Sequence, residues 1–330
     1  MDKTKEIPVH ADFQRAPGVM EGSMEYELSP DECNIPWWID SVAQGAWMGL
    51  DRGKRPGSEV PDYLRAPGPL RDSLMVEFAF RSLTEWEAVR ICALASASAP
   101  EVRTMEFFAT QTLDEARHAE TFRDHLLDLG VPREELLDTV ERLARPDAIK
   151  LIKPLWDWGW PQFQNGKEAG TWFIDTVVII TILLEGVLAP TSELSERKWK
   201  PFSPATADIE RGACVDEIRH LSVGSWVIRE HVQNNPGDKD RMVELVAEGR
   251  QIWATLPTAE IVYAREKLFQ EGLEQHGHVI GDYELIEGRP LVDTTPEERM
   301  QIALEWSTEI QASRLEYMGL EAAMAEEVRL

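Results

Sequence analysis

The sequence predicts an all-α protein built around four long helices, and three observations support this. Residues that favour helices, above all Glu, Leu, Ala and Arg, are common. From Pro69 onward, proline and glycine gather at a few breaks that separate long stretches. The motif Asp-Glu-x-Arg-His occurs twice on such stretches, at 114–118 and 216–220. The predicted helices span residues 70–98, 101–129, 168–198 and 204–233.

The segment before the first of these helices is irregular in composition. Residues 1–66 are rich in proline and glycine and contain one short apolar patch, 35–50. We expect an N-terminal arm that wraps the core and contains one modest helix. The remainder, residues 67–330, is expected to form one helical domain.

Two further regions complete the predicted architecture. The segment between the second and third helices carries Trp156, Trp158, Trp160 and Trp172 and is expected to cross the bundle as a cap. Two or three helices are expected after Gly237. The last should begin at residues 295–298, where Thr-Pro-Glu-Glu matches a capping box with proline in the first turn.

The charge balance narrows the range of partners. The 330 residues include 34 Lys and Arg against 59 Asp and Glu, which gives a formal net charge of -25. Such a charge repels nucleic acid and anionic membrane surfaces, so neither is an expected partner.

The cysteines and the most apolar stretch indicate a cytoplasmic protein. Three widely spaced cysteines without CxxC spacing predict neither a disulfide framework nor a zinc site. The stretch 172–190 is apolar, but Asp175 and Glu185 interrupt it and its unbroken run, 176–184, is short for a bilayer span. We therefore expect a helix buried inside the bundle and no membrane partner.

The repeated motif predicts a site for two metal ions. On a helix, residues three apart share a face, so each motif offers a Glu and a His to one metal. In four-helix bundles that hold two metal ions, two of the helices each contribute a Glu-x-x-His pair, and the other two helices each contribute one Glu. Among the acids of the first helix we choose Glu85, since Glu77 and Glu87 are placed less favourably, and the third helix has an isolated acid in apolar surroundings. The predicted ligands are Glu85, Glu115, His118, Glu185, Glu217 and His220.

The Asp and Arg that the two motifs share have an expected role beside the ligands. A metal-bound histidine usually donates its second ring N–H to a carboxylate. We expect Asp114 to serve His220 and Asp216 to serve His118, with Arg117 and Arg219 paired to these aspartates.

The alternative interpretation is a bundle whose acids form salt bridges only. A single Glu-x-x-His on a helix is common and usually solvated, but two matching copies are less easily explained in that way. The carboxylate-rich set, with one imidazole per metal, favours iron or manganese over zinc. His125 is expected to be a packed or surface residue.

At these residues the chain resembles the ferritin-like di-iron carboxylate superfamily, over about residues 70–233. The doubled motif is most similar to the hydroxylase subunits of bacterial multicomponent monooxygenases. The resemblance implies a ferritin-like four-helix bundle with two irons, or a mixed Mn/Fe pair, and O2 as co-substrate. It also implies that Glu115 and Glu217 bridge the metals.

Several departures bear on which member of the superfamily the chain resembles. Ala189 stands where those hydroxylases have a threonine, and Phe122 stands where the ribonucleotide reductase small subunit has its radical-bearing tyrosine. Ala213 and Cys214 stand where nitro-forming amine oxygenases have a third histidine. The length fits stand-alone N-oxygenases, such as the azoxy-forming oxygenase of valanimycin biosynthesis.

The resulting expectation is an oxygenase for a small molecule of specialised metabolism, with N-oxygenation favoured over C–H hydroxylation. Alternatives are a metal-storing or oxidant-scavenging ferritin relative, a desaturase-like or reductase-like di-metal protein, and a structural bundle. No nucleotide or iron–sulfur motif is present, so electrons should come from a separate reductase or ferredoxin. A homodimer is compatible with the sequence. By helical phase, the substrate pocket is expected to include Phe108, Gln111, Phe122, Thr181, Ala189 and Cys214.

Overall fold

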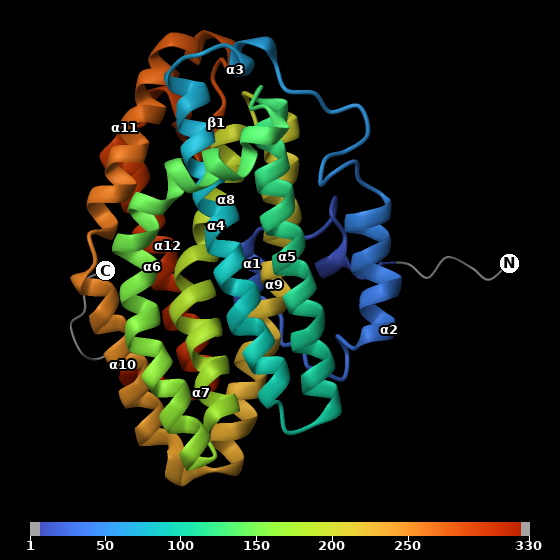
Figure 1. Cartoon of the computed structure of the whole chain (residues 1–330), viewed down its shortest axis with the longest axis vertical. Coiled ribbons are helices and arrows are strands. Elements are labelled where there is room, and N and C mark those ends of the chain that lie inside the picture. Colours follow the sequence, from blue (N-terminus) through green and yellow to red (C-terminus); the bar gives the residue numbers. More distant parts are fainter. Residues whose placement is uncertain (1–6, 325–330) are drawn as a thin grey trace, which may run out of the picture.

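The computed structural model describes residues 7–324, except for the side chains of residues 44, 46–48 and 169. This part of the chain is all-α apart from one small antiparallel hairpin, β1 (Glu284–Ile286) and β2 (Arg289–Pro290). The long helices run roughly along the longest axis of the molecule (Figure 1). The predicted fold class is therefore confirmed at the level of an all-α protein.

Four long helices form the centre of the molecule and match the predicted ranges within a few residues. The third is continuous in space but contains a π-helical segment, so it comprises three elements. In chain order the central helices are α4 (Pro69–Ser98), α5 (Val102–Asp128), α7 (Trp172–Val178) with η4 (Ile179–Glu185) and α8 (Gly186–Trp199), and α9 (Pro204–Asn234). α4 packs on α5, α5 on α9, α9 on η4 and α8, and α4 on α7 and η4, so the four enclose a common interior.

The tryptophan-rich segment is a helix and does not cross the bundle as a cap. It forms the long helix α6 (Leu136–Ala169), which packs along α4 and also contacts α7 and α10 (Figure 1). Our prediction was wrong because three prolines in this segment suggested breaks. Pro146 and Pro161 lie on the exposed face, where the carbonyl groups that they leave unpaired can bond to water.

The N-terminal segment contains more helix than expected. Its elements are η1 (Val9–Ala11), α1 (Val19–Glu25), α2 (Ile35–Trp38), η2 (Ile39–Met48) and α3 (Asp62–Arg65). α1 packs against α8, α9 and α12, and α2 contacts α5 (Figure 1). Ser222 on α9 ties this segment down, because its hydroxyl donates to the Tyr26 carbonyl and accepts from the Leu28 N–H, both at 2.7 Å. The segment therefore covers the side of the molecule formed by α5 and α9.

Three long helices follow α9, within the predicted number. They are α10 (Lys239–Thr255), α11 (Thr258–His276) and α12 (Pro296–Met318). The predicted start of α12 is confirmed, since Thr295 and Glu298 form a complete capping box. Short 3-10 turns connect the helices: η3 (Arg133–Glu135), η5 (Pro236–Asp238), η6 (Gly277–Val279), η7 (Leu291–Asp293) and η8 (Glu321–Met324).

The interior consists of two large apolar clusters with a polar layer between them. One cluster joins the start of α4 to the ends of α5 and α8, and includes Phe78 and Trp199. The other joins the end of α4 to the start of α5, α7 and η4, and includes Phe107 and Val177. Burial of both stabilises the fold through the hydrophobic effect and fixes the height of the residues between them.

The third central helix satisfies the length and composition of a membrane span. Within Trp172–Trp199, 78% of the most apolar window is buried inside the protein, as expected for a core helix. The three cysteines are free and buried, in agreement with the predicted lack of a disulfide framework.

Candidate metal centre

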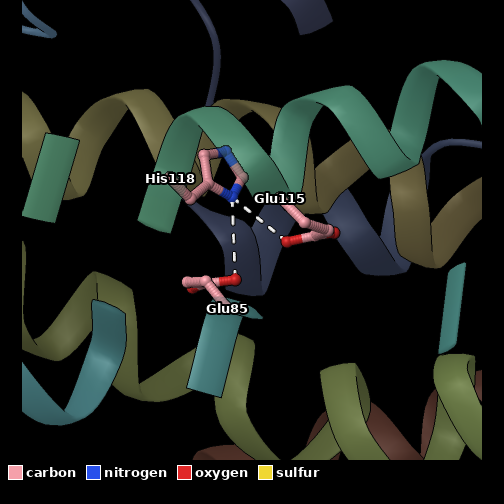
Figure 2. A group of neighbouring side chains, drawn as sticks. All are labelled: Glu85, Glu115 and His118. Atoms are coloured by element: carbon pink, nitrogen blue, oxygen red, sulfur yellow. Dashed lines mark hydrogen bonds and ion pairs between the residues drawn. The ribbon is translucent and has the colours of Figure 1, made fainter. Parts of the chain in front are cut away.

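The two motifs and the two isolated glutamates converge in the polar layer between the apolar clusters. Glu85 comes from α4, Glu115 and His118 from α5, Glu185 from the end of η4, and Glu217 and His220 from α9. His118 Nδ1 lies 3.3 Å from Glu115 Oε2 and 4.0 Å from Glu85 Oε2 (Figure 2). The ring centroids of the two histidines are 6.3 Å apart. Residues separated by more than 130 positions thus meet at one buried site.

Glu115 connects the two halves of the cluster. Its Oε2 faces His118, and its Oε1 lies 3.1 Å from Nδ1 of His220. Within residues 7–324, three groups of side chains have ligand atoms close enough together to hold a metal ion, and Glu115 belongs to all of them. These groups are Glu85, Glu115 and His118; Glu115, Glu217 and His220; and Cys92, Glu115 and Glu185. A carboxylate with one oxygen directed to each histidine suits a bridging position between two cations.

His220 has three carboxylates around its Nδ1, those of Glu115, Glu185 and Glu217. Glu185 Oε1 lies 3.6 Å from its Nδ1, and Glu217 Oε2 lies 4.0 Å from it. Cys92 reaches this region two turns after Glu85 on the same helix face, a spacing that the sequence analysis overlooked. Burial and the charges of the surrounding glutamates raise the pKa of Cys92 well above its usual value, which disfavours the thiolate form that binds metals.

The π-helical segment of the third helix determines where Glu185 lies. A π-segment interrupts the regular helical hydrogen bonds and leaves carbonyl groups to be satisfied elsewhere. Donors from neighbouring helices bond them: Gln311 to the carbonyl of Ile182 at 3.1 Å, and Trp253 to that of Leu183 at 2.6 Å. Contacts from α10 and α12 therefore stabilise the irregular turn that ends in Glu185.

The aspartates of the two motifs lie behind the histidines, with the pairing that the sequence predicts. His118 Nε2 is 3.2 Å from Asp216 Oδ2, and His220 Nε2 is 3.4 Å from Asp114 Oδ2. Each Nε2–H can donate to its aspartate, which leaves the Nδ1 lone pair directed at the glutamates.

The arginines of the motifs neutralise these aspartates. Arg117 forms an ion pair with Asp216, and Arg219 with Asp114. Arg219 also reaches Asp216 at 2.9 Å. Burial alone would raise the pKa of Asp216, but the charges of Arg117 and Arg219 outweigh it and hold that pKa well below its usual value.

The N-terminal segment contributes a further contact to this layer. The indole N–H of Trp38 donates to both oxygens of Asp114, at 3.1 and 3.2 Å. The neighbouring Trp37 ring lies 5.6 Å from the guanidinium carbon of Arg219. α2 therefore supports the orientation of His220 through Asp114. No spacing pattern in the sequence predicts this role.

The four glutamates carry more negative charge than the surrounding groups can balance. Burial raises the pKa of Glu85 and of Glu185 well above the usual value, and the charges of Glu115 and Glu217, respectively, add to this effect. Burial, with the charge of Glu115, also raises the pKa of Glu217 to about 7. Two divalent cations would balance the charge of the four carboxylates, since the aspartates and arginines already neutralise one another.

Buried polar atoms without hydrogen bonds also indicate that this cluster suits bound cations. Among the described residues, Glu185 Oε2 and Glu217 Oε2 are buried without a hydrogen-bond partner. Glu115 Oε1 and His220 Nδ1 are also buried and, although they lie 3.1 Å apart, form no hydrogen bond with each other. Buried polar atoms without partners are costly, so such a concentration of acceptors at one place calls for a ligand. The donor set of carboxylates with one imidazole nitrogen for each ion suits iron or manganese.

A mostly apolar cavity of about 180 Å³ adjoins the cluster on the side away from the histidines. All four glutamates line it, whereas the histidines and aspartates do not. Its remaining walls come from α4, α6, η4, α8, α10, α11 and α12, with apolar side chains that include Phe80, Leu184, Val187, Leu188, Trp253 and Ile261. A small molecule in this cavity would lie directly against the carboxylates.

Of the residues predicted for the pocket, Ala189 alone lines this cavity. Gln111 lies beside the cluster and donates to Glu185 Oε1. Phe108, Phe122 and Cys214 are packed in the apolar clusters, and the hydroxyl of Thr181 is buried against Gly224. Helical phase predicted that these side chains point to the interior, but it could not show on which side of the cluster the cavity lies.

Sequence reasoning missed a second group of charges beside the cavity, close to Glu85. It consists of Glu77, Arg81, Lys198, Glu210 and Glu266. Arg81 Nε lies 2.9 Å from Glu210 Oε1, which also accepts from the Ser195 hydroxyl at 2.6 Å. Burial nevertheless raises the pKa of Glu210 to about 8. The only sequence signal was spacing, since Arg81 lies one turn before Glu85 and Glu210 two turns before Glu217.

The residues set aside in the sequence analysis lie away from the proposed ligands. Glu77 accepts a hydrogen bond from the Trp199 indole at 3.1 Å, and Glu87 pairs with Arg90 at 3.3 Å. His125 is packed, with Nδ1 3.1 Å from Asp128 and Nε2 2.9 Å from the Thr206 hydroxyl.

The sequence matches no protein-family model and no curated protein significantly. A functional assignment therefore rests on the geometry of the site.

Proposed function

We propose that this chain is a non-heme di-iron oxygenase with a ferritin-like arrangement of α4, α5, the third central helix and α9. The observation that carries the proposal is that all four glutamates of a buried Glu/His cluster form one wall of an apolar cavity. A site that only stored or structurally held metal would have no need of such a cavity. The same geometry suits a small organic substrate placed next to the metal ions.

Two iron ions, or a mixed manganese–iron pair, would supply the reductive activation of O2. Glu85, Glu115 and His118 would hold one ion, and Glu115, Glu217 and His220 the other. Glu185 lies near the second histidine and would complete that half of the site. Glu115 is the bridging carboxylate in this proposal.

The protein contributes orientation and exclusion of water. Asp216 and Asp114 hold the imidazoles with Nδ1 toward the metal positions, while burial of the glutamates keeps bulk water from the reacting region. The apolar walls favour a substrate that leaves its hydration shell on binding.

We propose N-oxygenation of an amine as the reaction. Ala189 lines the cavity and offers no hydroxyl where the hydroxylases that the sequence resembles have a threonine. This departure disfavours C–H hydroxylation by their route. Electrons would come from a separate reductase or ferredoxin, and the cytoplasm, with its reduced cysteines, is the proposed location.

The test is turnover by iron-loaded protein with a chemical or ferredoxin-based reductant, a panel of small amines and isotopically labelled O2. The proposal predicts incorporation of labelled oxygen into an amine and loss of this activity in the Glu115→Gln variant. Consumption of O2 without an organic product would support an oxidant scavenger instead. Failure to retain metal would support a structural bundle and exclude the oxygenase.

A further inference from the structure

A second cavity, of about 60 Å³, adjoins the cavity at the carboxylates. Thr84, Ala88, Leu184 and Leu188 line both. The second cavity extends from these residues between α4 and α6 and ends among tryptophan and phenylalanine side chains of α6. The two together provide a continuous row of apolar surface that starts at the proposed metal site.

The second cavity offers a ligand almost nothing but hydrocarbon. The Thr84 hydroxyl donates to carbonyl groups of its own helix, at 2.9 and 3.1 Å, and is therefore already satisfied. Glu87 is engaged with Arg90. The other lining side chains are apolar, among them Ile91, Leu155, Trp158 and Phe163. Water is a poor occupant of such a cavity, whereas an apolar group fits it.

Gly159 is the feature that keeps this space open. It lies inside α6, where glycine weakens a helix relative to alanine. A Cβ at this position would meet only Phe163 ring atoms, at 3.8 and 3.9 Å, so no close backbone approach requires glycine. The residue lines the cavity, and the consequence of its missing side chain is room for another molecule.

The cavity also borders a more open cavity toward the surface. Glu87, Ile152 and Trp156 line both this cavity and a more open one on the outer face of α4 and α6. Arg90, Arg145 and Lys153 stand at that outer opening. A chain-like molecule could therefore enter between these helices and reach the carboxylates.

We propose that the cavity beside Gly159 binds the hydrocarbon chain of the substrate, which is an amine with an extended alkyl chain. This inference rests on the proposed function and specifies its substrate class. The amino end would lie in the larger cavity against the glutamates. The alkyl chain would pass Ala88 and lie against Trp158 and Phe163.

The test is calorimetric binding of butylamine, hexylamine, octylamine and decylamine to the full chain. We expect affinity to rise about fourfold per methylene as far as the cavity extends, because each buried methylene contributes a roughly constant hydrophobic gain. The matching alcohols separate burial of hydrocarbon from attraction of the ammonium group to an acidic protein.

Two variants fill the cavity from opposite walls. Gly159→Leu and Ala88→Leu should each weaken binding of octylamine and decylamine at least about tenfold. Gly159→Leu should also leave butylamine binding nearly unchanged, because Gly159 does not line the larger cavity that holds the amino end. Ala93→Leu adds the same bulk on the exposed face of α4 and serves as the matched control. If Gly159→Leu fails to fold, Gly159→Ala still narrows the cavity and should retain or raise the melting temperature.

An affinity that does not depend on chain length, or long-chain binding that survives both cavity-filling variants, would overturn the inference. An equal loss of turnover for all amines, with binding unchanged, would also overturn it and would indicate a passage for O2. Binding is measured without turnover. A chain-length effect without oxygenation would therefore contradict the proposed function alone, and oxygenation without a chain-length effect would contradict this inference alone.

Discussion

The Glu115→Gln substitution perturbs the cluster most, because Glu115 belongs to every group in the described part of the chain that could hold a metal ion. The side chain keeps its shape but loses its charge and one acceptor oxygen. Removing one partner from a buried charge-balanced site costs about 3–5 kcal/mol, which is at least about a hundredfold in affinity. Both ions should therefore be lost from Glu115→Gln, whereas Glu85→Gln should lose only the ion beside His118.

The magnitude in a thermal assay follows from the length of the chain. An ion present at a hundredfold excess over its Kd stabilises the folded state by about 2.7 kcal/mol. For 330 residues the entropy of unfolding is about 0.7 kcal/mol per degree, so each bound ion should raise the Tm by about 4 °C. The wild type should gain about 8 °C with Mn(II) or anaerobic Fe(II), Glu85→Gln about half as much, and Glu115→Gln almost nothing.

The assay is differential scanning calorimetry with metal analysis of the same samples. Glu120→Gln, an exposed glutamate on the same helix, is the matched control and should behave as the wild type. Retention of two ions by Glu115→Gln would refute the bridging role. An equal loss in Glu120→Gln would refute the location of the site.

Three further predictions follow from other contacts. Asp216→Asn should lower metal affinity about 10–100-fold, measured by competition with a chelator, because an asparagine no longer fixes the tautomer of His118; unchanged affinity would contradict this. The raised pKa of Glu210 means that, between about pH 5 and pH 8, the folded wild type keeps a proton on this carboxyl that the unfolded chain has released. The wild type therefore loses about 1.4 kcal/mol of unfolding free energy per pH unit as the pH rises through this range, and Glu210→Gln should not show this loss. Denaturant unfolding across this range measures the difference, and a trend of opposite sign would show that Glu210 is ionised in the folded state. Thr295→Ala should cost about 1 kcal/mol in the same assay through loss of the cap on Glu298, and no loss would indicate that packing alone begins α12.

The sequence was sufficient for the central helices because hydrophobic periodicity and breaks agree there. The repeated motif also brought together residues on two helices, since spacing of three on a helix fixes a common face. Glu185 could be identified because an isolated acid in apolar surroundings needs a partner.

The remaining features depend on contacts between distant segments. α6 continues through three prolines because tertiary packing and exposed carbonyl groups offset their local cost, which local sequence rules do not include. The cavity could not be placed because helical phase gives the direction of a side chain but not the gap between helices. The contact of Trp38 with Asp114 arises from an irregular segment without periodicity.

We propose above that two metal ions bind between the four glutamates and the two histidines. Anomalous X-ray diffraction at the iron and manganese edges, on crystals of metal-loaded protein, tests it most directly. We expect two peaks on either side of the Glu115 carboxylate, one beside Nδ1 of His118 and one beside Nδ1 of His220. Peaks confined to the protein surface, with this buried cluster free of metal, would contradict it.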